Sequence, residues 1–173
     1  MTELVGLTVM FFVVLLFLRA ASHKALDFLQ FQGFVADYQL LPQALVVPIS
    51  VSLVVVEIAI VVMLVSGFYW QAALFLASSL LLLYGIAIGW NVRRGRRQIE
   101  CGCGGIPQQL SYRLVLRNLC LALLVLVPVA TLGADTASGF LLVPMCASVL
   151  LMMTYLLFEQ VANNAVAAKL PSA

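Results

Sequence analysis

Residues 44–65 read ALVVPISVSLVVVEIAIVVMLV, a run in which Glu57 is the only charged side chain. A helix needs about 20 consecutive, mostly apolar residues to cross the hydrocarbon core of a bilayer. The run shows no two-residue alternation of apolar and polar side chains, which favours a helix over a strand. The stretch therefore predicts a membrane-spanning helix that carries one ionisable group near its middle.

Four further apolar runs of similar length complete the pattern. The five predicted spans cover residues 4–22, 44–65, 72–90, 111–132 and 139–158. Of the 173 residues, 64% are hydrophobic and 9% are charged, whereas about a quarter of a typical soluble domain is charged. This composition leaves too little polar surface to cover a soluble globule, and it excludes disorder. We predict an all-α polytopic membrane protein: a four-helix core with a fifth span packed outside it, in a single transmembrane domain over residues 1–173.

Two connections between the predicted spans are long. In residues 23–42, Phe28, Phe31 and Phe34 recur every three residues. This spacing predicts a short amphipathic helix at the membrane surface or over the mouth of the bundle. Residues 91–110 hold a pair of cysteines at a membrane boundary. The chain after residue 158 is small and polar, and we expect this tail to fray.

Small residues within the spans predict close helix packing. Gly85 and Gly89 form a G-x-x-x-G pair in the third span, which lets another helix approach closely. We expect that neighbour to belong to the same bundle. Cys120 and Cys146 lie inside the fourth and fifth spans, where a free cysteine behaves as a small hydrophobic residue. We therefore expect both cysteines to serve in packing.

The remaining two cysteines, Cys101 and Cys103, lie in the stretch RRGRRQIECGCGGIP, which covers residues 93–107. Nearby arginines favour a thiolate, as does a helix N-terminus, which the residues from Pro107 onward predict. A turn at Gly102 would bring the two Cα atoms within the roughly 7 Å that a disulfide needs. So small a ring would be strained and readily reduced. The pattern therefore favours thiol–disulfide exchange over a structural disulfide.

Two other interpretations of the pair remain open. Two thiolates can hold a soft metal such as Cu(I) or Zn(II), but a closed zinc site needs four ligands, so His23 and the other cysteines would have to contribute. The crowded arginines would also repel a cation. The second alternative is a purely structural glycine-rich turn.

Charged residues within and beside the spans are candidates for supporting roles. Glu57 lies at a depth where an ionisable group is costly, so it is a functional-site hypothesis by default. It is predicted to be a protonated acid, a proton acceptor for redox chemistry, or the partner of Arg117 or Arg19. A pair that only fixes helix register is equally compatible. Lys24, like Arg19, is expected to extend its charged end to the interface.

Several of these motifs together resemble the MauE family. The first connection contains FVADYQLLP at residues 34–42, and the second contains RGRR at residues 94–97 followed by ECGCGG at residues 100–105. The stretch SYRLVLRN follows at residues 111–118. The resemblance covers about residues 14–130 and includes Glu57. Family members usually carry Phe where Gly104 stands, which makes the turn looser here.

The resemblance implies a thiol-redox role in the membrane. MauE proteins are accessory factors for methylamine dehydrogenase, a periplasmic enzyme with a disulfide-rich small subunit that carries tryptophan tryptophylquinone. The family is thought to act beside MauD, a thioredoxin-like protein. The MauE family also resembles DoxX proteins and, more distantly, DsbB and vitamin K epoxide reductase. By analogy with these relatives, a quinone is a candidate electron acceptor. Cys101 and Cys103 would be the exchanging, redox-active pair of a thiol–disulfide oxidoreductase.

In that role three arginines, Arg96, Arg97 and Arg113, would favour the thiolate, while Glu57 and Arg117 would form a polar element in the bundle. The expected location is the bacterial inner membrane, with several passes. The expected partners are membrane lipid, a MauD-type protein and a disulfide-rich periplasmic client, with no nucleic acid. A non-catalytic scaffold that recruits a thioredoxin-like partner, and a soft-metal handling protein, remain the alternatives.

The sidedness of the cysteine pair is left open by two conflicting arguments. All nine Lys and Arg residues fall in regions that share one face of a five-span topology. Because such residues mark the cytoplasmic side, the charge count places the long connections in the cytoplasm and the N-terminus outside. A periplasmic client instead requires the cysteine pair to face the periplasm, or requires electrons to cross the membrane.

Overall fold

The structure is a computed structural model that describes residues 1–96, 110–133 and 141–167, without the side chains of residues 165–167. The described part contains helices and no strands. The helices are α1 (Thr2–Leu26), α2 (Phe28–Asp37), α3 (Gln43–Ser66), α4 (Trp70–Arg93), α5 (Tyr112–Leu124), α6 (Val127–Thr131) and α7 (Leu142–Ala167). Five segments of this part are long and apolar enough to cross a membrane, with α5 and α6 together forming the fourth. The predicted all-α polytopic membrane fold is confirmed.

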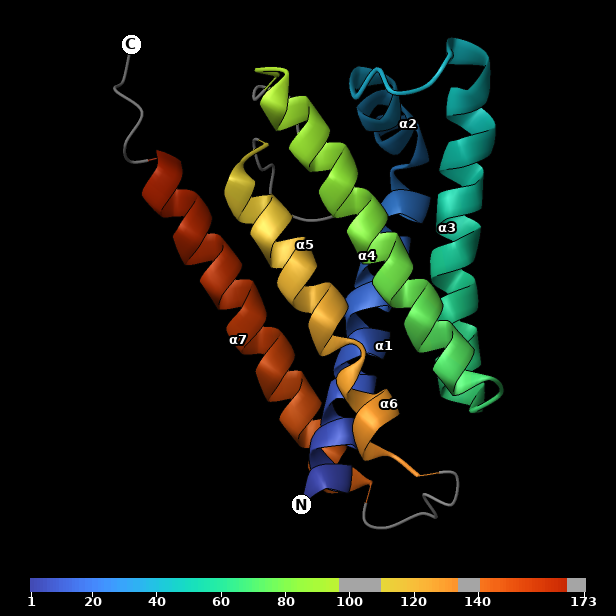
Figure 1. Ribbon diagram of the computed structural model, residues 1–173, viewed down its shortest axis with the longest axis vertical. Coiled ribbons are helices and arrows are strands. Elements are labelled where there is room, and N and C mark those ends of the chain that lie inside the picture. The colour runs from blue at the N-terminus through green and yellow to red at the C-terminus, as the bar shows by residue number, and fades with distance from the viewer. Residues whose placement is uncertain (97–109, 134–140, 168–173) are drawn as a thin grey trace.

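The helices form an elongated bundle in which α1 contacts α2, α3, α6 and α7 (Figure 1). The antiparallel neighbour of α5 is α4, which also contacts α3. The last helix, α7, lies at one edge of the bundle (Figure 1), and 17% of its spanning segment is buried, against 28–44% for the other four. The fifth span is therefore the outer one, beside a core built from the first four.

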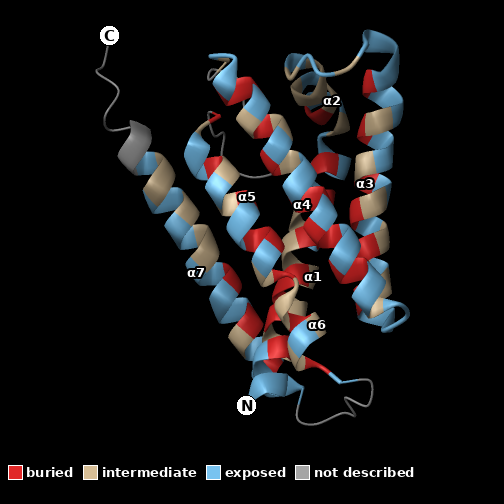
Figure 2. Ribbon diagram, in the orientation of Figure 1, coloured by how far each residue is buried: buried red, intermediate tan, exposed pale blue. Residues whose placement is uncertain are grey.

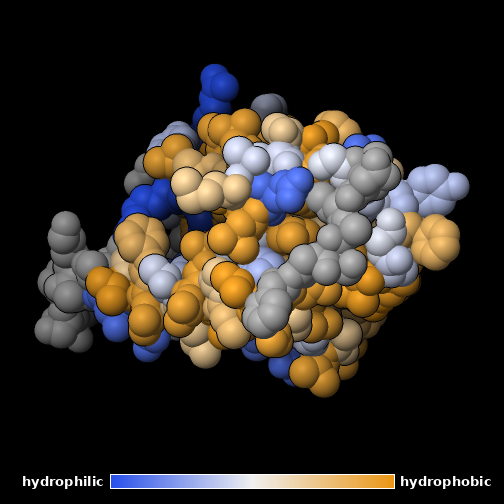
Figure 3. All heavy atoms as spheres, turned by 90° about the horizontal axis from the view of Figure 1, so that it is seen from below, coloured by the Kyte–Doolittle hydropathy of each residue, from blue (hydrophilic) through white to orange (hydrophobic). Residues whose placement is uncertain are grey.

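The outer surface of the bundle is apolar. Buried residues face the neighbouring helices in Figure 2, while large hydrophobic side chains such as Val62, Ile86 and Leu150 are exposed. The end-on view in Figure 3 is likewise dominated by hydrophobic residues. An apolar patch this extensive is foreign to a soluble monomer and suits contact with lipid tails.

The observed helices differ from the predicted spans most clearly in the fourth and fifth spans, and α1 also continues past residue 22 to Leu26. The predicted fourth span is divided into α5 and α6, because Pro128 has no backbone N–H to donate to the carbonyl four residues earlier. The fifth helix does not stop at residue 158 but continues to Ala167. The expectation of a frayed tail directly after residue 158 is therefore wrong, because residues such as Glu159 and Ala162 still contact α5.

The short helix predicted in the first connection is α2. Phe31 on this helix is buried, while Leu29 is 83% exposed. The helix packs against α1 and α3 near the end of the bundle where α1 ends and α3 begins (Figure 1). The phenylalanine spacing thus marked the face of α2 that covers the bundle.

The glycine pair of α4 lies against α5, as expected for packing within the bundle. A Cβ atom on Gly85 would lie 3.4 Å from Cβ of Asn118, and one on Gly89 would lie 3.6 Å from Cγ2 of Val115. Cys120 and Cys146, however, are both exposed. Their expected packing role is wrong, because each lies off the stripe of its helix that faces the bundle.

Candidate functional site

The first polar cluster inside the bundle joins three helices. Lys24 from the last turn of α1 forms an ion pair with Oε1 of Glu57 on α3. Tyr84 on α4 donates its hydroxyl to the same oxygen at 2.8 Å and accepts a hydrogen bond from Lys24 Nζ at 3.0 Å. Lys24 and Glu57 are 3% and 0% exposed. We call Lys24, Glu57 and Tyr84 the Glu57 cluster.

The Glu57 cluster corrects two predictions. Glu57 is paired with Lys24, and neither Arg117 nor Arg19 forms an ion pair with it. Lys24 does not extend to the interface, because α1 continues past it to Leu26 and places it on the same buried face as Phe17 and Ala21.

Aromatic rings complete the surroundings of the Lys24 ammonium group. Nζ lies 4.6 Å from the centroid of the Tyr84 ring and 5.2 Å from that of Phe31 on α2. Such cation–π contacts are strongest where water is excluded. Phe31 thus links α2 to the buried charge, in addition to its apolar packing.

A second cluster repeats the same chemistry between α5 and α7. Arg117 forms an ion pair with Oε1 of Glu159, and Tyr155 donates its hydroxyl to that oxygen at 2.9 Å. We call Arg117, Tyr155 and Glu159 the Glu159 cluster. Glu159 was absent from the sequence-based candidates because it comes one residue after the predicted end of the fifth span. The inward positions Ser148, Met152 and Tyr155 recur at helical spacing and could have extended the prediction to residue 159.

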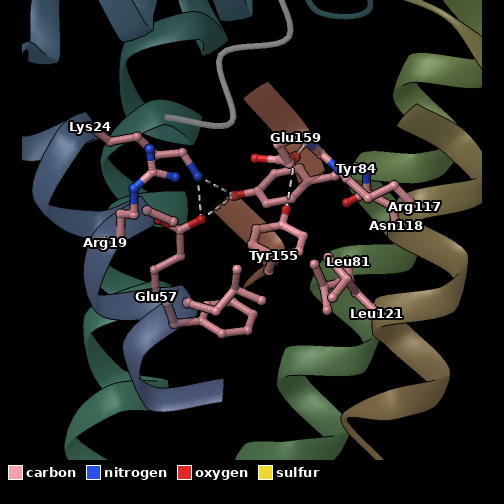
Figure 4. A pocket seen from close by; sticks show the side chains of 13 residues that line it. Arg19, Lys24, Glu57, Leu81, Tyr84, Arg117, Asn118, Leu121, Tyr155 and Glu159 are labelled. Atoms are coloured by element: carbon pink, nitrogen blue, oxygen red, sulfur yellow. Dashed lines mark hydrogen bonds and ion pairs between the residues drawn. The ribbon is translucent and has the colours of Figure 1, made fainter. Parts of the chain in front are cut away.

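Both clusters line one cavity of about 50 Å³ (Figure 4). Arg19 of α1 and Asn118 of α5 also line it. This volume is the space open to the centre of a water-sized sphere, and about 10–15 Å³ of it is needed for each water molecule. The cavity is therefore large enough for a few small polar atoms. The cavity lies among α1, α3, α4, α5 and α7, so each of the five spanning segments contributes to it.

Two further sequence-predicted residues, Arg96 and Arg113, lie at the end of the bundle where α4 ends and α5 begins. Arg96 donates to the carbonyl oxygen of Asp37 at 3.3 Å, and Arg113 donates to that of Ala162 at 3.0 Å. These contacts tie the ends of α2 and α7 to the core. Arg97, Cys101 and Cys103 lie outside the described residues.

The two ends of that connection are side by side. Val92 of α4 and Leu110, which precedes α5, belong to one buried apolar cluster, against which Tyr38 packs. Burial raises the pKa of the Tyr38 phenol, and the positive charge of Arg117 lowers it in part. The phenol therefore stays neutral at physiological pH.

Within the described part of the chain, no group of three or more His, Cys, Asp or Glu residues comes close enough to hold a metal ion. Cys101 and Cys103 lie outside that part, so the soft-metal alternative for the pair stays open. Cys120 and Cys146, which such a site would have to recruit, are on the outer faces of their helices.

Comparison with known proteins identifies the family. The family model for the methylamine utilisation protein MauE matches residues 2–132. The chain belongs to the MauE family. A MauE protein of Paracoccus denitrificans is 41% identical over 117 residues, which cover 66% of this chain and 63% of the relative. MauE proteins of Methylorubrum extorquens and Paracoccus versutus are 40% and 34% identical over 138 and 139 residues.

The match to these MauE proteins extends over most of the chain. The alignments with the Methylorubrum extorquens and Paracoccus versutus proteins each cover 75% of this chain. They cover 74% and 75% of those relatives, respectively. For the Paracoccus denitrificans relative, the aligned part is slightly less than two-thirds of its length. No solved structure matches the chain significantly. Family membership thus implicates the chain in methylamine utilisation. The family assignment rests on the sequence comparisons and does not depend on the fold.

Proposed function

We propose that this MauE-family chain catalyses thiol–disulfide exchange in the bacterial inner membrane, through Cys101 and Cys103. The exchange would assist disulfide formation in a periplasmic enzyme such as methylamine dehydrogenase. A thioredoxin-like protein of the MauD kind would be the exchange partner. The family assignment supports the pathway, and the C-x-C motif supports the chemistry.

The observation that carries the proposal is the placement of the C-x-C motif in the chain. The motif falls in the 97–109 connection, whose flanking residues are joined by the packing of Val92 with Leu110. Arg96, at the start of this connection, is held by the carbonyl of Asp37. Arg96 precedes Cys101 by five residues in the sequence, and positive charge close to a cysteine is the kind of surrounding that favours a thiolate.

The proposed reaction passes two electrons among three proteins: this chain, the partner and the client. One thiolate of the pair attacks a partner disulfide, so that a mixed disulfide forms and one partner thiolate leaves. The second cysteine then attacks its neighbour's sulfur in the mixed disulfide and releases the partner as a dithiol. Two electrons have passed to the partner, and the pair of this chain is now oxidised. A client dithiol returns the pair to the reduced state by the reverse steps and gains a disulfide.

Replacement of the two cysteines tests the proposal. In cells that make Cys101→Ser/Cys103→Ser, we expect client cysteines, trapped by acid and alkylated, to shift from disulfides to thiols. The single replacement that removes the resolving cysteine should accumulate a mixed disulfide with the partner, whereas the one that removes the attacking cysteine should form none. Cys120→Ser, on the outer face of α5, is the matched control and should behave as wild type. Normal client disulfides in the double variant would refute the exchange and favour a non-catalytic scaffold.

Labelling tests the sidedness that a periplasmic client requires. In a Cys120→Ser/Cys146→Ser background, a membrane-impermeant maleimide should modify reduced Cys101 and Cys103 in spheroplasts. Labelling that appears only after the membrane is lysed would place the pair on the cytoplasmic side, in agreement with the arginine count. In that case exchange with a periplasmic partner at these cysteines would be excluded.

A further inference from the structure

The cavity between the Glu57 and Glu159 clusters has an unbalanced set of charges. Three cationic side chains line it, from Arg19, Lys24 and Arg117, against the two carboxylates of Glu57 and Glu159. Lys24 and Arg117 are each paired with one of these carboxylates. The lining therefore carries one positive charge beyond those that its ion pairs neutralise, and that charge belongs to Arg19.

Arg19 has no acceptor of its own in the described part of the chain. It forms no ion pair there, and no side-chain hydrogen bond. Arg19 lies five residues before Lys24 on α1, which places its backbone about 7.5 Å further from the C-terminal end of that helix. Figure 4 shows it beside Lys24 and Glu57. An arginine inside a membrane bundle is costly unless an acceptor meets it.

Glu57, in contrast, has an acceptor atom that lacks a hydrogen-bond donor. Its Oε1 atom accepts from both Lys24 and Tyr84, whereas its Oε2 atom is buried and has no hydrogen-bond partner among the described residues. A buried acceptor without a donor has lost its hydrogen bonds to water and gained none in return, which is unfavourable. One cavity thus contains a donor group that needs acceptors and an acceptor that needs a donor.

We propose that this cavity binds a small monovalent oxyanion that carries a hydroxyl group, of the size and shape of hydrogencarbonate. Its negative charge balances Arg19, and two of its oxygens can accept from the planar guanidinium group side by side. Its hydroxyl donates to Oε2 of Glu57. The cavity volume of about 50 Å³ suits a planar group of four heavy atoms. This site is independent of the thiol chemistry proposed above.

Nitrate provides a sharp control ligand, because it has the same charge, planarity and number of heavy atoms but no hydroxyl. The measurement is the thermal unfolding midpoint of the full chain in detergent at pH 8, with potassium salts of equal ionic strength and chloride as the baseline. Hydrogencarbonate should raise the midpoint saturably, by on the order of 5 °C at about 100 times its dissociation constant. Nitrate should raise it much less.

Variants assign the effect to the cavity. Arg19→Gln should lose the response to hydrogencarbonate, while Arg93→Gln, which removes the same charge from an exposed position, should keep it. Arg19→Lys keeps the charge but loses the planar pair of donors, so its response should weaken. Glu57→Gln replaces an acceptor by a donor and should abolish the preference for hydrogencarbonate over nitrate.

Three outcomes would overturn the proposal. They are equal responses to both salts in the wild type, an unchanged response in Arg19→Gln, and no saturable response to hydrogencarbonate, which would leave water as the occupant. If Arg19→Gln does not fold, the weakened response of Arg19→Lys and the lost preference of Glu57→Gln still decide the matter.

Discussion

Each carboxylate in the core receives a cation and a tyrosine hydroxyl on the same oxygen. Glu57 is bound in this way by Lys24 and Tyr84, and Glu159 by Arg117 and Tyr155. Sequence inspection singled out Glu57, Lys24 and Arg117 because charges are rare in apolar runs. It could not choose their partners, since these depend on how each helix is rotated about its axis. For the same reason, the sequence alone does not distinguish a tyrosine that points into the bundle from one that lies at the membrane interface.

The Lys24–Glu57 pair makes a prediction at the level of single residues. Lys24→Met leaves a buried carboxylate without its cation and should lower the free energy of unfolding by roughly 3–5 kcal/mol, because breaking a buried pair strands a charge. Lys24→Met/Glu57→Met removes both charges and should be much less destabilised than either single variant. Thermal unfolding in detergent, arranged as a double-mutant cycle, measures this coupling.

Tyr84→Phe is the milder companion of these variants. It removes one hydroxyl from the Glu57 cluster and should lower the free energy of unfolding by about 1 kcal/mol.

The outcome that would contradict the ion pair comes from the double-mutant cycle. Additive effects of the Lys24 and Glu57 replacements would show that the two side chains do not interact in the folded chain.

At the level of helices, close approach between α1 and the end of α6 depends on Gly6. A Cβ atom there would lie 2.9 Å from Cγ of Leu132 and closer still to Oγ1 of Thr131. Gly6→Ala should therefore destabilise the bundle by about 1–3 kcal/mol through overpacking.

Gly33→Ala is the matched control, because Gly33 lies within α2 with nothing within 4 Å of its would-be Cβ. Alanine is the better helix former, so this variant should gain about 0.5–1 kcal/mol. Unfolding midpoints of the two variants, measured side by side, should move in opposite directions. A shift of the same sign in both would contradict the packing of α1 on α6.

Helix boundaries were predictable only where the apolar run coincides with the helix. This is nearly so for α3, whose bounds of Gln43–Ser66 lie close to the predicted 44–65. It fails for α7, because helix formation needs no apolar side chains once Arg113 and Arg117 supply polar contacts beyond residue 158. It also fails at Pro128, where an uninterrupted apolar run hides a missing hydrogen bond.

For the whole molecule, the apolar exterior predicts which cysteines face lipid. Cys120 and Cys146 are exposed on helices α5 and α7. In liposomes, nitroxide labels at these positions should collide often with oxygen and rarely with a water-soluble nickel chelate. Each labelled cysteine is kept in a chain whose other native cysteines are all replaced by serine, so that only one cysteine remains in each sample.

A label on an exposed residue of the first connection, such as Asp27→Cys, should show the reverse order of collision rates. Frequent collisions of the nickel chelate at Cys146 would instead mean that α7 faces water or a polar partner. The fifth span would then not be a lipid-facing helix at the edge of the bundle.

The ion pair between α1 and α3 also constrains how the nascent chain enters the bilayer. Lys24 and Glu57 belong to two successive hydrophobic segments that leave the ribosome one after the other. Glu57 lies near the middle of its segment, where a bare charge costs about 2.5–3.5 kcal/mol during insertion. The first segment is thus best released from the translocon together with the second, as a hairpin whose charges have already met. Biogenesis of this protein would then begin with a two-helix unit, and loss of Lys24 would delay insertion of α3, because Glu57 would enter the bilayer without its cation.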